Sequence, residues 1–215
     1  LRVFGHATEP RCIVNIGGFS NVSILEKNQY RGFDTGPGNC LLDYWVKEHF
    51  DLDYDDAGNL AASGICNETL LNCCLADPYF ARSTPKSTGR EYFNPEWLRL
   101  KLVASGQKIA PVDVLATLLQ LTALSISTEI KRYTSPMTRV FICGGGAHNL
   151  ELLVQLSVSL EQTVQTTASL GIDPDNVEAA LFAWLAKERL CNMPVDLCGI
   201  TGSKRAVVLG GIYGI

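Results

Sequence analysis

Most of the features that mark specialised classes of protein are absent from this sequence or sparse in it. Charged residues make up only 19% of its 215 residues, and the net charge of −4 offers no basic surface to nucleic acid or to an anionic membrane. Polar or charged residues interrupt each apolar run, so we expect no segment that crosses a bilayer. The first residue is not methionine, and no signal-peptide pattern follows it. We therefore expect a chain cut from within a longer protein, with neither nucleic acid nor a membrane as its partner.

Paired cysteines are also lacking. The 8 cysteines are scattered without a Cys-x-x-Cys pair, and the three histidines show no metal-ligand spacing. Cys12 and Cys143 lie in apolar segments, which favours buried free thiols over a disulfide framework. The sequence therefore predicts a reducing, cytoplasmic location and no zinc site, and it leaves the ligands of any other metal unidentified.

Apolar residues make up 47% of the sequence, and they fall into two kinds of pattern. Short apolar runs predict strands, and longer stripes at helical spacing predict helices. The length suits one large domain, or one and a half, with an ample core. The expected strands are residues 13–16, 21–25, 30–33, 139–143, 163–166 and 206–209. The expected helices are residues 39–50, 58–62, 67–75, 94–102, 111–133, 149–160 and a last helix that begins at Asp173.

Two of these helices carry clear apolar faces. Residues 111–133 form the longest helix, and their continuous apolar stripe predicts a core element. The last helix is expected to bury a face made by Val177, Ala180, Leu181, Trp184 and Leu185. Glu178 lies in its first turn, where the helix dipole favours a negative charge. The alternative role for Glu178 is a polar site residue that points at a ligand.

Residues 12–39 are the most informative stretch of the chain. Two of the expected strands meet at Gly17-Gly18, and this corner is flanked by Asn15, Ser20 and Asn21. Such a corner offers backbone N–H groups to an anion. The plainer interpretation is that the two glycines serve only the turn.

Asp34 stands alone in a turn of small residues, 32–39, in which a ligand could approach the backbone closely. A phosphate seat and a carboxylate base at adjacent strand ends are the minimum equipment for phosphoryl transfer. An aspartate beside Gly-Pro is usually a turn residue, and the hairpin alone favours that ordinary role. The motifs in the rest of the chain favour the functional interpretation, in which Asp34 is a carboxylate base.

A second glycine corner, Gly144-Gly145-Gly146, directly follows the expected strand 139–143. A strand, a glycine turn, a helix and a strand in this order are typical of nucleotide sites. A dinucleotide fingerprint would require glycine at Asn149 and an acid near Gln165, so a Rossmann dehydrogenase is not expected. Close approach to a nucleotide and tight strand-to-helix packing explain the three glycines equally well.

Lys86 and Arg90 lie in a polar loop whose Lys-Ser-Thr resembles the end of a Walker A motif. No glycine precedes Lys86 and no glycine-rich loop lies upstream, so the P-loop interpretation fails. The two cations either face an anionic ligand or belong to a solvated surface, and the sequence favours the solvated surface.

Taken together, these motifs resemble the anhydro-N-acetylmuramic acid kinases of bacterial cell-wall recycling. The match runs in order over nearly the whole chain, and the combination is specific although each motif alone is weak. The matching stretches are residues 15–21, 32–39 with Asp43 and Trp45, 85–91 with Phe93 and Asn94, 143–149, 178–185 and 192–202.

The resemblance implies an α/β lobe of the actin/hexokinase-like ATPase type, a ribonuclease H-like mixed sheet with flanking helices, in a two-lobed enzyme. It implies that ATP phosphorylates O6 of 1,6-anhydro-N-acetylmuramic acid while water opens the anhydro bridge. The products would be N-acetylmuramate 6-phosphate and ADP, and Mg²⁺ would bridge the phosphates.

The resemblance also implies roles for individual residues. Asp34 matches the general base that activates water, and Glu178 matches a carboxylate near the reacting centre. The phosphate-binding residues would be Asn15, Gly17, Gly18, Ser20 and Asn21. The adenosine side would be formed by Gly144, Gly145, Gly146 and Asn149. The residues expected to contact the sugar are Thr35, Gly36, Asn39, Lys86 and Arg90.

One departure from the family concerns the first phosphate loop, a Met-Ser-Gly-Thr-Ser type motif that this sequence lacks. Residues 1–215 would then be the second, C-terminal lobe of the kinase, with most of the first lobe missing. We expect this chain to be weakly active or inactive alone, and its exposed cleft face to favour association, for example as a homodimer. Two alternatives stay open: a nucleotide-binding or regulatory protein without catalysis, and a different sugar kinase of the same superfamily.

Overall fold

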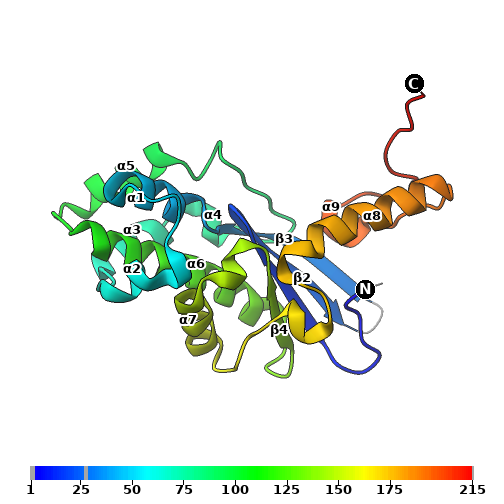
Figure 1. Cartoon of the computed structure of the whole chain (residues 1–215), viewed down its shortest axis with the longest axis horizontal. Helices are drawn as coiled ribbons and strands as arrows, with labels where there is room; N and C mark the ends of the chain where they lie inside the picture. Colours follow the sequence, from blue (N-terminus) through cyan, green and yellow to red (C-terminus); the bar gives the residue numbers. More distant parts are fainter. Residues whose placement is uncertain (1–2, 27–28, 215) are drawn as a thin grey trace.

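A mixed five-stranded sheet forms the centre of the computed structural model, which describes residues 3–26 and 29–214 (Figure 1). The strand order is β3-β2-β1-β4-β5. The pairs β1–β2 and β2–β3 are antiparallel, whereas β1–β4 and β4–β5 are parallel. The strands are β1 (Arg11–Ile16), β2 (Phe19–Glu26), β3 (Gln29–Pro37), β4 (Arg139–Cys143) and β5 (Gln165–Thr166). The predicted α/β mixed sheet is thus confirmed.

The helices begin where the sequence provides caps. The side chains of Asn67, Asn94 and Asn149 each accept a hydrogen bond from a backbone N–H three residues later, which satisfies a donor that the first turn leaves open. The α-helices are α1 (Cys40–Phe50), α2 (Asn59–Ser63), α3 (Glu68–Leu75), α4 (Pro78–Ala81), α5 (Pro95–Ser105), α6 (Pro111–Tyr133), α7 (Leu150–Leu160), α8 (Val177–Leu190) and α9 (Cys198–Thr201). Short 3₁₀ turns are η1 (Asp56–Gly58), η2 (Gly145–His148), η3 (Thr167–Leu170) and η4 (Pro174–Asn176).

The helix α6 packs against the sheet and forms the core, as its apolar stripe predicts. Leu115, Leu121 and Ile126 are fully buried in the same cluster as Val14 and Ile142 of the central strands. By length and composition α6 is also apolar enough to cross a membrane, which corrects the expectation that no segment would be. Within the fold, 61% of that apolar stretch is buried. Packing against the sheet therefore accounts for its hydropathy.

The expected buried face of α8 is wrong for most of its length. Val177 packs against the strand residues Ile13 and Phe141, but Leu181 is 48% exposed. The residue of α8 that the fold fully buries is Glu188, and Phe182, next to Leu181, is 68% exposed. In Figure 1 this helix extends away from the sheet, on the side opposite α1, α3 and α5. An apolar stripe predicts burial only if a second surface is present to cover it, and the described part of the chain leaves most of this helix uncovered.

Smaller differences concern the strands and the cysteines. The expected strand at 206–209 is reduced to a single bridge between Val207 and Val195, and β5 is only two residues long. Cys12 and Cys143 are buried free thiols, as predicted, and burial raises the pKa of each to about 12.

Candidate active site

Asp34 lies inside β3, which corrects the expectation that a turn holds it. The strand continues to Pro37 because a bulge lets its backbone follow β2 past this point. Ser20 pairs with Gly36 and Asn21 pairs with Asp34, so Thr35 is the extra residue of the bulge. Such bulges re-aim neighbouring side chains and are common beside active sites.

Three predicted site residues form a row across the sheet. Asn15 of β1 stands opposite Asn21 of β2, and Asn21 stands opposite Asp34 of β3. Residues directly opposite one another share a face of the sheet. Asn15 Nδ2 donates to Glu178 Oε1 at 3.0 Å, which adds a second carboxylate to the row. The row thus runs from Asp34 through Asn21 and Asn15 to Glu178, which lies 144 residues beyond Asp34 in the sequence (178 − 34).

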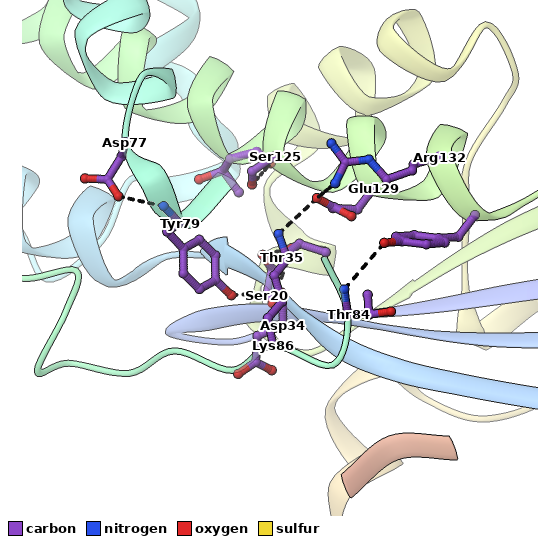
Figure 2. Close-up of polar contacts among 12 residues, drawn as sticks. Ser20, Asp34, Thr35, Asp77, Tyr79, Thr84, Lys86, Ser125, Glu129 and Arg132 are labelled. Carbon is purple, nitrogen blue, oxygen red and sulfur yellow. Dashed lines mark hydrogen bonds and ion pairs between the residues drawn. The ribbon is translucent and has the colours of Figure 1, made fainter. Parts of the chain in front are cut away.

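The carboxylate of Asp34 is held by a neighbouring loop. Thr88 N–H donates to Asp34 Oδ2 at 3.0 Å, and the backbone N–H of Asp34 donates to the carbonyl oxygen of Lys86 at 3.1 Å. The hydroxyl of Tyr79 donates to the backbone oxygen of Asp34 at 2.9 Å (Figure 2). Burial raises the pKa of Asp34, and the hydrogen bond from Thr88 opposes that rise. A half-buried carboxylate with a raised pKa is a suitable proton acceptor.

A cavity of about 470 Å³ adjoins this carboxylate. Its walls come from β2, β3, the loop 85–87 and the short helix α9. Ile200 and Thr201 of α9 form the wall that sequence reasoning assigned to no site, although residues 192–202 matched the family pattern. The side chain of Asp34 is therefore open to a ligand rather than sealed in the core.

The first glycine corner is tied to the start of α1. Gly17 N–H donates to Phe19 O within the turn, and the carbonyl of Gly18 accepts from the N–H groups of Gly38 and Cys40. A Cβ on Gly38 would lie 2.5 Å from the carbonyl oxygen of Gly17, so only glycine fits there. At least one N–H of this corner is used internally, and the predicted phosphate contacts of Gly17 and Gly18 stay predictions.

The second glycine corner packs directly onto Asn15 and Ile16 at the end of β1, beside the first corner. Gly144 has a φ of +77°, and a Cβ there would lie 2.3 Å from Asn15 Oδ1. A Cβ on Gly146 would lie 2.4 Å from a side-chain carbon of Ile16. Tight packing thus explains Gly144 and Gly146, whereas Gly145 has more room, because a Cβ there would lie 3.7 Å from Asn39 Nδ2. The two corners lie side by side at the end of β1 and β4.

Several other predicted ligand residues have structural roles. Ser20 and Thr35 are fully buried and share a hydrogen bond of 2.5 Å between their hydroxyl groups. Asn149 caps α7, and Gly36 is buried against Phe80. Their predicted contacts with sugar or nucleotide stay predictions.

The two cations of the loop differ. Arg90 is exposed, whereas Lys86 is buried and forms an ion pair with Glu129 of α6 at 2.9 Å. The favoured interpretation of both as a solvated surface is therefore wrong for Lys86. Its ammonium group already has an acidic partner, and its predicted contact with the sugar stays a prediction.

Sequence reasoning assigned no role to two acidic residues that the fold places near this region. Glu129 pairs with Lys86, and its only signal was a lone acid on the apolar stripe of α6. Asp43 lies in the first turn of α1, and burial raises its pKa to about 6. Asp43 was noted only as part of the family pattern.

The sheet order and the paired glycine corners define the class of protein: an α/β domain of the actin/hexokinase-like ATPase fold. A solved structure of this fold, the activator of the 2-hydroxyisocaproyl-CoA dehydratase from Clostridium difficile with bound ADPNP, agrees. It superimposes with a TM-score of 0.52 at 17% identity and covers 87% of this chain and 65% of that chain. At this identity the likeness concerns the fold alone.

The family is given by sequence comparison. The family model described as anhydro-N-acetylmuramic acid kinase matches residues 2–214, and the chain belongs to that family. Anhydro-N-acetylmuramic acid kinase of Cupriavidus pinatubonensis is 46% identical over 98% of this chain, and that of Coxiella burnetii is 46% identical over 96%. The chain spans 57% and 56% of the lengths of these two relatives. The resemblance read from the motifs is confirmed.

Proposed function

We propose that this chain forms the second lobe of a kinase that phosphorylates 1,6-anhydro-N-acetylmuramic acid and opens its anhydro bridge with water. The products are N-acetylmuramate 6-phosphate and ADP. The observation that carries this proposal is the half-buried carboxylate of Asp34, which adjoins a cavity and stands in one row with Asn21 and Asn15.

In the proposed reaction Asp34 accepts a proton from the water that attacks the anomeric carbon. The new bond joins the water oxygen to that carbon, and the bond from the carbon to the bridging oxygen, O6, breaks. O6 takes the γ-phosphoryl group of ATP as it leaves, so no separate acid is needed. The raised pKa of Asp34 supports this role, because a carboxylate destabilised by burial accepts a proton more readily.

The remaining residues of the row would position the phosphates and the nucleotide. Phosphoryl transfer depends mainly on alignment and charge neutralisation. Asn15 and Asn21 flank the first glycine corner, and Glu178 fixes the amide of Asn15. Gly145 is the glycine of the second corner with space beside it, which suits close approach of an adenosine group.

Mg²⁺ would neutralise the negative charge of the ATP phosphates. Residues 3–26 and 29–214 contain no group of three or more His, Cys, Asp or Glu side chains that could hold a metal. Mg²⁺ in kinases is usually held by one or two carboxylates together with the phosphates, and Glu178 is the carboxylate of this row that the proposed reaction does not use as the base. A metal that arrives with the nucleotide fits this donor set.

The test is the fate of the water oxygen. The intact two-lobed enzyme is incubated with ATP, the anhydro sugar and H₂¹⁸O, and the product is analysed by mass spectrometry; we expect one ¹⁸O in the phosphorylated sugar. Asp34→Asn is expected to abolish the product while ATP binding, measured by isothermal titration, survives. Asp53→Asn, an exposed acid of the 51–56 loop, is the matched control. Near-normal turnover of Asp34→Asn would remove Asp34 from the mechanism.

The same experiment separates the alternatives. Because the chain spans little more than half the length of its relatives, we expect it to be weakly active or inactive by itself. Binding of ATP by the intact enzyme without any product supports a nucleotide-binding or regulatory protein. A phosphorylated sugar without ¹⁸O, obtained from a panel of sugars, supports a different sugar kinase, because such an enzyme consumes no water.

A further inference from the structure

A buried ion pair lies behind the loop that holds Asp34. Lys86 Nζ and Glu129 Oε1 are 2.9 Å apart, and their side chains are only 1% and 3% exposed. Arg132 Nη1 lies 3.2 Å from the same oxygen of Glu129, and the ring of Tyr79 lies 4.8 Å from Lys86 Nζ. Figure 2 shows Glu129 and Arg132 together on α6, with dashed lines marking these ion pairs. The loop is therefore fastened to the core helix by charge.

Folding stability alone does not explain this buried ion pair. Removing two charges from water is unfavourable, and an apolar pair of similar size is often as stabilising. In addition, Glu129 Oε2 is buried and has no hydrogen-bond partner among the residues that the structure describes. An arrangement with such a penalty is best explained by the geometry that it imposes on the loop.

That geometry leads directly to Asp34. Lys86 is held at both ends: its ammonium group binds Glu129, and its carbonyl oxygen accepts the N–H of Asp34 at 3.1 Å. Two residues further on, Thr88 N–H donates to Asp34 Oδ2 at 3.0 Å. A shift of Lys86 would therefore move the donor that orients the carboxylate.

We propose that Glu129 is a positioning residue that acts through Lys86 to hold the Thr88 N–H against the Asp34 carboxylate. Its importance for catalysis rests on the function proposed above, in which Asp34 is the base. This set of contacts, from Glu129 through Lys86 to the Thr88 N–H and the Asp34 carboxylate, is called the clamp below. It is a property of the folded chain and can be measured without turnover.

The groups around Asp34 show what loss of the clamp would do. Besides Thr88, the neighbouring groups are Lys86, which contributes its carbonyl, and Tyr79, whose hydroxyl binds the backbone oxygen of Asp34. The hydrogen bond from Thr88 is the contact that stabilises the charged carboxylate and lowers its pKa against the effect of burial. Without it, the pKa of Asp34 rises further, and the loop amide becomes open to solvent.

The experiment compares the parent with Glu129→Gln, and uses Arg132→Gln as the matched control. Arg132→Gln removes a cation from the same oxygen but keeps the pair with Lys86. Amide hydrogen exchange at Thr88 and the ¹³C titration of the Asp34 carboxyl are followed by NMR. In Glu129→Gln we expect exchange at Thr88 to become about tenfold faster or more, as for loss of one hydrogen bond, and the Asp34 pKa to rise. In Arg132→Gln both should match the parent.

Unchanged exchange and an unchanged titration in folded Glu129→Gln would overturn the proposal. If that variant does not fold, the charge-free double variant Lys86→Met/Glu129→Leu is measured by the same two criteria. If neither folds, the parent decides: exchange at Thr88 as slow as in α6 supports the clamp, and exchange at the rate of an open loop overturns it.

The outcomes keep this inference separate from the proposed function. Faster exchange of the Thr88 amide in Glu129→Gln, together with an active Asp34→Asn enzyme, would support the clamp and refute Asp34 as the base. Unchanged exchange in Glu129→Gln, together with an inactive Asp34→Asn enzyme, would refute the clamp and support Asp34 as the base.

Discussion

At the scale of single residues, burial of the Asp34 carboxylate links its protonation to folding stability. It raises the pKa, so the folded state binds a proton more tightly than the unfolded state does, and folding stability falls as pH rises through the folded pKa. Asp34→Asn removes this effect while its amide oxygen can still accept from Thr88. We expect unchanged or slightly higher stability at pH 7 in urea unfolding, together with lost turnover. A clear loss of stability would contradict this account of Asp34.

Asp43 gives a stronger pH signal, because burial raises its pKa from 3.8 to about 6. Folding takes up a proton between those two values, so the folded state loses stability as pH rises from about 4 to about 6. Asp43→Asn should therefore be more stable than the parent at pH 7, by about 1 to 2 kcal/mol after allowing for partial exposure, and equal to it near pH 3.5. Urea unfolding at both pH values measures this.

The control for Asp43 is Glu48→Gln, an exposed acid on the same helix α1. It should change stability little at either pH. If Asp43→Asn behaves like Glu48→Gln, the carboxyl of Asp43 is charged in the folded protein at pH 7 at no cost, and the raised pKa is wrong.

At the scale of elements, the contact between the two glycine corners can be tested with one substitution. Gly144→Ala would place a Cβ 2.3 Å from Asn15 Oδ1 at a φ of +77°. Gly171 has a similar φ of +84° with nothing within 4 Å of its Cβ position, but its ψ of 12° is ordinary left-handed backbone, whereas the ψ of 179° at Gly144 belongs to a region that essentially only glycine adopts. The extra loss for Gly144→Ala therefore reports both the contact with Asn15 and this additional backbone strain. We expect a loss of about 1 kcal/mol for Gly171→Ala and about 2 to 4 kcal/mol for Gly144→Ala, by denaturant unfolding. Equal losses would mean that the corners are not packed together.

The sequence predicts those elements that local patterns determine. The bounds of α6 are the predicted 111–133, because proline, a long apolar stripe and Ser-Pro define them locally. The row of Asn15, Asn21 and Asp34 depends on strand register and on a bulge, which no local pattern reveals. The pair of Lys86 and Glu129 joins residues 43 positions apart, and periodicity carries no signal for it.

Predictions also fail where a pattern needs a partner surface. The stripe on α8 has the same helical spacing as the one on α6, yet α6 is covered along its length whereas α8 meets the sheet cluster only through Val177 at its start. Burial also affects a residue predicted to contact the sugar, because the bulge turns Thr35 into the core, although that predicted contact stays a prediction. Motif resemblance identifies the segment that forms a site, whereas packing decides which of its side chains face the ligand.

At the scale of the whole molecule, the exposed face of α8 predicts association. Leu181 and Phe182 are adjacent, 48% and 68% exposed, and large apolar patches on a surface usually mark contacts. We expect the double variant Leu181→Ser/Phe182→Ser to shift the chain toward monomer in sedimentation velocity measured over a range of concentrations. Its unfolding free energy should change by less than about 0.5 kcal/mol, because the side chains are already exposed.

Val103→Ser is the matched control for α8, because Val103 is an apolar residue of α5 that is 67% exposed on another part of the surface. A loss of association in both variants would reflect general surface hydrophobicity rather than the α8 face. A parent that is monomeric at all concentrations would show that α8 does not drive self-association. We would then expect the apolar face of α8 to contact residues that do not belong to this chain. The chain spans 57% of the length of a relative, so the relative has further residues that could form such a contact.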